Sequence, residues 1–169
     1  KAMAAMVHLT GKESPPLAVV VSAIVQNGKI LLVHRAKRPF QGYWGMIGGK
    51  LKHDETLIQG AIREAKEETG LDVAFDHFCG LCHEHVKEKG AIKHSLLLFV
   101  CKMHPAGGAL AQSNEGEVRW FDLASIDAQK VVPSDVWMIK NMLDKKVYLP
   151  FSTMDETAQN VYEFSADVH

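Results

Sequence analysis

The sequence predicts an α+β or α/β fold in which one mixed β-sheet is sandwiched between helices. Several segments rich in valine, isoleucine and leucine alternate with turn residues, which is typical of strands. One stretch between these segments and another after them have the period of a helix. Strands, a helix, more strands and a closing helix favour one sheet covered by helices.

The first strands are predicted to form a hairpin. Leu17–Gln26 and Lys29–His34 are rich in β-forming residues, and Asn27-Gly28 lies between them. Asn-Gly is the strongest short hairpin signal because both residues tolerate the positive φ of a tight turn. The later elements expected are a basic loop over Ala36–Tyr43, a strand over Trp44–Ile47 that ends at Gly48-Gly49, a helix over Thr56–Thr69, strands over Val73–His85 and Ile92–Lys102 joined by a turn at Lys87–Gly90, a loop at Pro105–Gly108, a strand over Glu117–Phe121 and a helix over Asp135–Leu143.

The helix over Thr56–Thr69 is predicted from its apolar stripe and from its end. Gly70 supplies a C-terminal stop. Residues three and four positions apart share one face of a helix, and that face packs on a core when it is apolar. The stripe consists of Leu57, Ile58, Ala61, Ile62 and Ala65.

The chain of 169 residues suits one domain of ordinary size. We expect an N-terminal extension over residues 1–16, the domain over residues 17–147, and a C-terminal tail without clear periodicity over residues 148–169. Hydrophobic residues make up 47% and charged residues 23% of the chain, as in ordinary globular proteins. The formal net charge of -1 provides no global field that would draw the protein to nucleic acid or to a membrane.

The cysteine content favours a reducing, cytoplasmic setting. Cys79, Cys82 and Cys101 cannot all pair within one chain, and nothing else suggests a disulfide framework. The apolar run Leu17–Val25 is about half the length that a membrane span needs. We therefore expect no membrane partner, and a homodimer stays open.

Three glutamates of the predicted helix are candidates for a metal site. Glu64, Glu67 and Glu68 are spaced i, i+3 and i+4, which brings their carboxylates to one face. Clustered carboxylates repel one another, and a hard cation such as Mg²⁺ removes that conflict. The helix alone equally fits a solvated acidic face that Arg63 and Lys66 neutralise.

The residues before the helix favour the metal site. Gly48-Gly49 permits a close backbone approach, and Lys50 adds a positive charge. The N-terminus of a helix also attracts anions. Together these features predict a phosphate site beside a metal site.

The same region resembles the Nudix box. Gly49 is followed after five residues by Glu55, and after seven more by the run Arg63-Glu64-Ala65-Lys66-Glu67-Glu68-Thr69-Gly70-Leu71. All seven fixed positions of that motif match, and alanine and leucine fill its two apolar positions. The order of the flanking elements also resembles the Nudix fold, over Leu17–Leu143.

The resemblance implies a role for each matching residue. The side chains of Glu64, Glu67 and Glu68 and the backbone carbonyl of Gly48 match metal ligands, for Mg²⁺ or alternatively Mn²⁺. Arg63 matches a structural arginine that orients the glutamates. The expected catalytic set is therefore Glu55, Arg63, Glu64, Glu67 and Glu68.

Further roles concern the phosphates and the attacking water. Lys50 and Arg35 occupy places where relatives hold phosphate. Metal ions polarise the phosphoryl group and lower the pKa of a bound water, which attacks phosphorus in line. The candidates for the base that takes the proton are Glu64 and, from a later loop, Glu115 and Glu117.

The segment Val118–Asp122 looks like the strand that ends beside the nucleobase in many relatives. Trp120 or Phe121 is a candidate to stack on a base, and Asp122 or Asp135 to read its edge. Strand alternation sends the two aromatic residues to opposite faces, so at most one faces the ligand. Core packing is the alternative for both.

Two other patterns are weaker. His77, Cys79, Cys82, His83 and His85 crowd one segment, and two of them have zinc-ligand spacing. Positions three apart on a strand point to opposite faces, so we interpret these as ordinary strand residues. The basic loop with Arg35, Lys37 and Arg38 is a weak sign of RNA binding, because phosphates of a small ligand explain it as well.

The predicted function is that of a Mg²⁺-dependent pyrophosphohydrolase. It would cleave a phosphoanhydride bond in a nucleoside-diphosphate-linked substrate, above all a nucleoside triphosphate, oxidised forms included, to give the monophosphate and pyrophosphate. The alternatives are an ADP-ribose or nucleotide-sugar pyrophosphatase and a non-catalytic nucleotide-sensing module. ADP-ribose-specific relatives usually carry a proline a short distance beyond the box, where this chain has His85-Val-Lys-Glu88.

Overall fold

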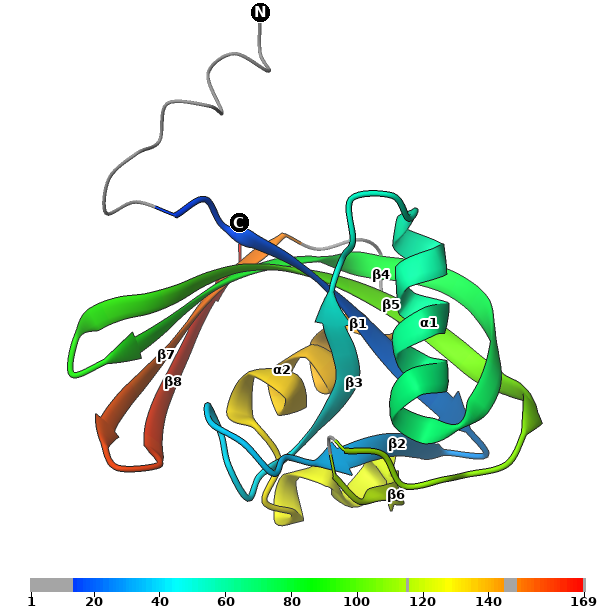
Figure 1. Cartoon of the computed structure of the whole chain (residues 1–169). Coiled ribbons are helices and arrows are strands. Elements are labelled where there is room, and N and C mark those ends of the chain that lie inside the picture. Colours follow the sequence, from blue (N-terminus) through cyan, green and yellow to red (C-terminus); the bar gives the residue numbers. More distant parts are fainter. Residues whose placement is uncertain (1–13, 115, 145–148, 169) are drawn as a thin grey trace, which may run out of the picture.

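The computed structural model describes residues 14–114, 116–144 and 149–168. Its elements are β1 (Leu17–Gln26), β2 (Lys29–His34), β3 (Trp44–Lys50), α1 (Leu57–Thr69), β4 (Leu71–Glu88), β5 (Ala91–Gly108), β6 (Val118–Asp122), the 3-10 helix η2 (Leu123–Ala128), α2 (Pro133–Met142), β7 (Pro150–Ala158) and β8 (Val161–Val168). Within the described part, the strands form one eight-stranded mixed sheet in the order β6-β2-β3-β1-β5-β4-β7-β8. Figure 1 shows the sheet curling around α2, with α1 outside the curl.

The sheet separates two hydrophobic clusters, and each helix covers one of them. Val20 of β1 packs in the same cluster as Ala61 and Ala65 of α1. The next residue, Val21, packs in the cluster that contains Met138 of α2. This alternation along one strand confirms the predicted mixed sheet between helices.

The predicted N-terminal hairpin is confirmed. Gln26 of β1 pairs with Lys29 of β2. Asn27 and Gly28 of the turn have φ values of 51° and 72°, the left-handed backbone that favours these two residue types.

The expected end of a strand at Gly48-Gly49 is wrong, because β3 continues through both glycines to Lys50. Gly48 and Gly49 pair with Val21 and Val20 of β1. A Cβ at Gly48 would lie 2.4 Å from the carbonyl oxygen of Val20. The glycines therefore allow a close approach between strands and do not end the strand.

The helix α1 begins and ends where the sequence predicts, but it buries a different face. Thr56 forms a capping box at its start, and Gly70 adopts the left-handed conformation at its end. Ile58 and Ile62 of the predicted stripe are 40% and 38% exposed. The small residues of the stripe pack on the sheet instead, and this rotation buries Glu68.

The loop expected at Pro105–Gly108 is also wrong, since β5 extends through it. β4 starts directly after α1, and its Leu71 pairs with Gly108. Pro105 pairs at a register shift between Asp72 and Val73, where a residue without a backbone N–H is tolerated.

The C-terminal tail, for which the sequence shows no periodicity, forms the hairpin β7–β8. The strand β7 pairs in parallel with β4 and extends the same sheet. Its buried positions include Ser152, Met154 and Glu156, so polar residues hide the usual apolar alternation. Glu156 is buried because it pairs with Arg38 of the basic loop.

Candidate active site

Gly49 of β3 lies directly against the side chain of Glu64 on α1. A Cβ at Gly49 would lie 2.4 Å from Cδ of Glu64 and within 2.6 Å of both its carboxylate oxygens. Only a glycine leaves this space to a carboxylate. Gly49, the first residue of the motif, thus lets the carboxylate of Glu64 pack directly on the β3 backbone.

Arg63 forms hydrogen bonds with several acidic residues of the motif. Its guanidinium donates two hydrogen bonds to Glu55, at 2.6 and 2.8 Å, and one to Glu64 at 2.5 Å. It also donates to Glu67 at 3.2 Å and to the backbone carbonyl of Lys50 at 3.2 Å. The fork geometry of arginine suits such a shared role, which a lysine cannot fill. Arg63 therefore fixes the carboxylates relative to β3.

These contacts shift the pKa values of Glu55 and Arg63. The hydrogen bonds from Arg63 and from the Lys52 backbone N–H lower the pKa of Glu55 from 4.5 to about 2. The same carboxylate raises the pKa of the Arg63 guanidinium. Both groups stay charged over the whole physiological pH range.

Glu68 lines a small polar cavity. This residue is 6% exposed. The cavity has a volume of about 150 Å³, and its lining includes Glu68, Gly48, Arg35 and Lys37. A buried carboxyl and a strand backbone thus face two cations from the loop after β2, an arrangement suited to phosphate oxygens and a cation.

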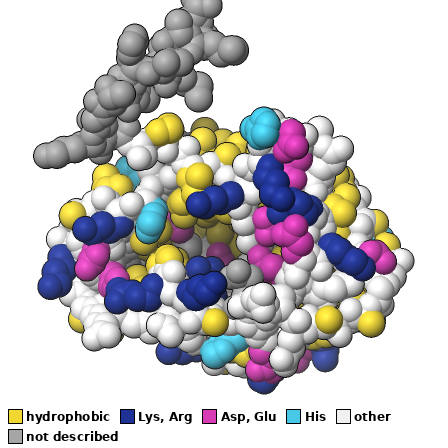
Figure 2. All heavy atoms as spheres, in the orientation of Figure 1, with side chains coloured by type: hydrophobic (Ala, Val, Ile, Leu, Met, Phe, Trp, Pro, Cys, Tyr) yellow, Lys and Arg dark blue, Asp and Glu magenta, His cyan; other side chains and the backbone are white. Residues whose placement is uncertain are grey.

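A larger pocket of about 380 Å³ adjoins the small cavity. The two share Arg35, Met46 and Gly48 as lining residues. Figure 2 shows a hollow bordered by Lys and Arg side chains, with acidic side chains gathered beside it over α1. The pocket is in the usual size range of a small-molecule site.

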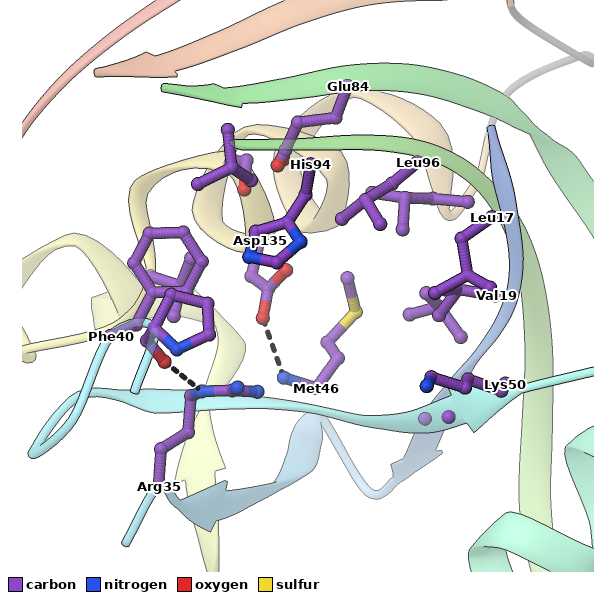
Figure 3. A pocket seen from close by; sticks show the side chains of 18 residues that line it. Leu17, Val19, Arg35, Phe40, Met46, Lys50, Glu84, His94, Leu96 and Asp135 are labelled. Carbon is purple, nitrogen blue, oxygen red and sulfur yellow. Dashed lines mark hydrogen bonds between the residues drawn. The ribbon is translucent and has the colours of Figure 1, made fainter. Parts of the chain in front are cut away.

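The pocket combines polar groups with an apolar wall. Lys50 and Arg35 line it on the β3 side and Glu84 of β4 lines it at the opposite side, with Asp135 of α2 between them, hydrogen-bonded to the Met46 backbone and near Arg35 (Figure 3). Its apolar wall is formed by Leu17, Val19, Val21, Phe40, Met46, Val86, Leu96, Leu98 and Val132. Such a wall is suited to a flat ring.

The two carboxyl groups in the pocket have raised pKa values. Burial and the charge of Asp135 raise the pKa of Glu84 to about 8, partly offset by a hydrogen bond from Ser134. Desolvation raises the pKa of Asp135 to about 6, against a hydrogen bond from the Met46 backbone N–H at 2.7 Å. Nearby Arg35 also acts to lower the pKa of Asp135.

Of the four residues proposed to contact a base, Asp135 lines the larger pocket and the other three do not. Phe121 is 8% exposed and packs edge-on against Trp44 in the core under α2. Trp120 packs against the other cluster, under α1. Asp122 lies 4.0 Å from Lys29 at the surface.

The proposed loop bases and phosphate ligands are placed as follows. Glu117 pairs with Arg119 at 2.7 Å, and Glu115 lies outside the described residues. Arg35 is held by a hydrogen bond to the Pro39 carbonyl at 2.9 Å and lines both cavities. Lys50 is exposed and lines the larger one.

The donor atoms around α1 fit a hard divalent cation. Glu64 fills the space above Gly49, Glu68 shares a polar cavity with Gly48, and all the donors are oxygens. Over the described ranges, however, no three His, Cys, Asp or Glu side chains form a group that could hold a metal ion. Arg63 holds Glu64 and Glu67 in ion pairs, and Glu68 lines the small cavity.

Sequence reasoning missed Glu84. The alternation on β4 turns Cys82, Glu84 and Val86 inward, and each is buried. The signal was an acidic residue at an inward position of a predicted strand, which is unusual without a partner or a ligand.

The cysteines are buried free thiols. Their placement shows that the expected opposite orientation of Cys79 and Cys82 is wrong. Cys79 and Cys82 belong to the same hydrophobic cluster, although positions three apart were expected on opposite faces. A register shift between Phe78 and Gly80 marks a β-bulge, which adds a residue and reverses the alternation. Burial raises the pKa of Cys79 to about 11 and that of Cys82 to about 12, so both thiols stay protonated.

Replacing both Cys79 and Cys82 by serine is expected to leave turnover within about threefold of the wild type, because neither thiol lines either cavity of the site. Steady-state rates of the double variant and metal analysis of the purified protein check this. Stoichiometric zinc that disappears in the double variant would show that the two residues are ligands.

Comparison with known proteins assigns the family. The NUDIX domain family model matches residues 16–142. The chain is 30% identical over 129 residues to the oxidized purine nucleoside triphosphate hydrolase of Danio rerio, covering 76% of this chain and 80% of that protein. It is 29% identical over 122 residues to an ADP-ribose pyrophosphatase of Methanocaldococcus jannaschii, covering 68% and 70%. The solved MutT protein of Bacillus halodurans has the same fold, with a TM-score of 0.70 and 24% identity over 89% of this chain and 97% of that one.

The curled sheet and the glutamate helix are those of a Nudix fold, as predicted. The chain belongs to the NUDIX domain family. It is a hydrolase of pyrophosphate bonds in nucleotide-like compounds, which sets aside a non-catalytic module. Nudix hydrolases generally use divalent metal ions and act on small nucleotide substrates. Among the helices of the described residues, none has the length and apolar character to cross a membrane.

Proposed function

We propose that this hydrolase is Mg²⁺-dependent and cleaves nucleoside triphosphates, oxidised purine forms included, to the monophosphate and pyrophosphate. The observation that carries the proposal is the junction of the two cavities, which share Arg35, Met46 and Gly48. A nucleoside in the larger pocket would direct its phosphates past Lys50 and Arg35 into the cavity that contains Glu68.

The charges support this orientation. Phosphate groups are attracted to Lys50 in the larger pocket, to Arg35 at the junction and to Lys37 in the small cavity. Asp135, an anion above about pH 6, repels them, so the part of the pocket that Asp135 and Glu84 line suits an uncharged nitrogen heterocycle.

The metal would be held by Glu64, Glu67 and Glu68 with the backbone carbonyl of Gly48. When bound, Mg²⁺ neutralises phosphate charge and lowers the pKa of a coordinated water. Arg63 positions Glu64 and Glu67, and Glu55 positions Arg63 in turn. In the hydrolysis, one P–O bond forms from water as the bridging P–O bond breaks, and the water's proton passes to a carboxylate. Glu64 is the proposed acceptor, because its carboxylate lies against Gly49, next to the proposed metal ligand Gly48.

ADP-ribose is the alternative substrate, and the similarity to the Methanocaldococcus jannaschii pyrophosphatase supports it. Several cations at one junction suit three phosphates better than two phosphates and a sugar. The similarity to the Danio rerio enzyme also supports a purine triphosphate. The three buried free thiols support a reducing, cytoplasmic setting.

We expect kcat/KM for at least one nucleoside triphosphate to exceed that for ADP-ribose at equal free Mg²⁺. Steady-state rates over the common and 8-oxo purine triphosphates, ADP-ribose and nucleotide sugars measure this, with chromatography to identify the monophosphate. A higher kcat/KM for ADP-ribose than for every triphosphate would overturn the preference. Equal rates of monophosphate formation in Mg²⁺ and in EDTA would overturn the metal requirement.

A further inference from the structure

Glu84 is a buried acidic residue that the proposed chemistry does not use. It projects from β4 between Cys82 and Val86 and is 2% exposed. It lines the larger pocket at the end away from Lys50, and Figure 3 shows its carboxyl group directed to the same space as that of Asp135. The two residues come from elements far apart in the sequence and meet only at this pocket.

One oxygen of this carboxyl group lacks a partner. Oε1 of Glu84 is buried and has no hydrogen-bond partner within the described part of the chain. A buried polar atom without a partner destabilises the fold, whereas an apolar residue of similar size at this position would not. Such an atom in a pocket indicates a ligand that supplies the missing hydrogen bond.

The groups around Glu84 determine its charge. Asp135 and Ser134 face it from α2, Arg35 from the loop after β2, His94 from β5 and Cys82 from its own strand. Because burial and Asp135 raise its pKa to about 8, Glu84 is mostly neutral at neutral pH. A neutral carboxyl group donates one hydrogen bond through O–H and accepts another at C=O. Asp135, with a pKa of about 6, is mostly ionised and accepts only.

We propose that Glu84 determines specificity by hydrogen-bonding the nucleobase of the substrate, together with Asp135. The ligand group is a nitrogen heterocycle that carries a hydrogen-bond acceptor next to an N–H donor. The acceptor atom of the heterocycle accepts a hydrogen bond from the Glu84 O–H. The N–H groups of the heterocycle donate hydrogen bonds to Glu84 or Asp135. This assignment rests on the proposed function insofar as the heterocycle belongs to a nucleotide.

The test measures binding without catalysis. Isothermal titration of the full chain with dGMP, dAMP, dCMP and dTMP in EDTA gives Kd for the wild type, Glu84→Gln and Glu84→Leu. We expect the wild type to bind at least one monophosphate and Glu84→Leu to bind it at least about tenfold more weakly, because the lost hydrogen bond has no substitute. Glu84→Gln keeps a donor and an acceptor, and its Kd is expected within about threefold of the wild type.

The control is Glu88→Leu, the same change at an exposed position of the same strand, which should bind as the wild type does. Thermal melting establishes that each variant is folded. The removal of a buried carboxyl group without a partner is not expected to lower the Tm of Glu84→Leu.

The pH dependence provides a second readout. As the pH rises through about 8, Glu84 ionises beside Asp135, loses its donor and repels the ligand's acceptor. The affinity of the wild type should therefore fall above about pH 8, whereas that of Glu84→Gln should not. Equal pH profiles would overturn the assignment. So would unchanged binding by Glu84→Leu, or no detectable binding of any monophosphate by the wild type.

Turnover by the wild type distinguishes the two proposals. Triphosphate hydrolysis combined with unchanged monophosphate binding by Glu84→Leu overturns the role of Glu84 alone. Weakened binding by Glu84→Leu in a protein that hydrolyses no triphosphate overturns the proposed substrate alone.

Discussion

Replacing Glu68 by glutamine is expected to lower kcat/KM for the best substrate by at least about 100-fold while the fold is retained. Glutamine has the same shape but lacks the negative charge that would bind a cation. Glu68 is buried in the small cavity beside Gly48, where a lost charge is not replaced by solvent. Steady-state kinetics at saturating Mg²⁺, with circular dichroism and thermal melting, measure the effect.

The matched control for this variant is Glu88→Gln, which makes the same change at an exposed position of β4. Its kcat/KM is expected to equal that of the wild type. Near-normal Mg²⁺-dependent turnover by Glu68→Gln would show that the metal site lies elsewhere.

Replacing Arg63 by alanine is expected to lower kcat/KM by about 10- to 100-fold, the usual effect of losing a residue that orients metal ligands. Without the guanidinium, Glu64 and Glu67 lose their common partner, and Glu55 no longer connects to them. Lysine at this position should restore little activity, because it lacks the planar fork. Lys66→Ala is the control on the same helix, since Lys66 pairs with Asp72 away from the site. Activity of Arg63→Ala equal to that of Lys66→Ala would contradict this role.

The Arg63–Glu55 pair also predicts a pH dependence of stability. The pKa of Glu55 is lowered from 4.5 to about 2 in the folded protein, so folding favours its ionised form. This contribution is fully present above about pH 5 and is lost as the pH falls through about 2. The Tm difference between the wild type and Glu55→Gln should therefore be constant above about pH 5 and shrink below it. A difference independent of pH from neutrality to about pH 2 would show that the ionised pair does not stabilise the fold.

The residues of the glutamate helix were predictable because their geometry is local. Positions three and four apart on a helix are neighbours, so the spacing already places Glu67 within reach of Glu64 and Arg63. The capping residues Thr56 and Gly70 were equally local signals, and they define the ends of α1 in the structure. The Asn27-Gly28 turn belongs to the same class.

Which face of α1 is buried could not be predicted from the local sequence. Isoleucines at positions 58 and 62 are more hydrophobic than the alanines, yet the sheet accepts the small residues Ala61 and Ala65. The same face of the helix buries Glu68. The C-terminal hairpin was missed for a related reason, since Glu156 faces inward on β7 and is satisfied by Arg38, a residue far away in the sequence.

The sequence alone thus determines the family, the glutamate helix and the class of chemistry, because these depend on spacings within a short segment. The larger pocket depends on tertiary structure. Glu84 of β4 and Asp135 of α2 come together only when β4 and α2 pack against each other, and their pKa values arise from that burial. No sequence pattern links two single acidic residues so far apart, and the free energy that holds them together comes from the surrounding core.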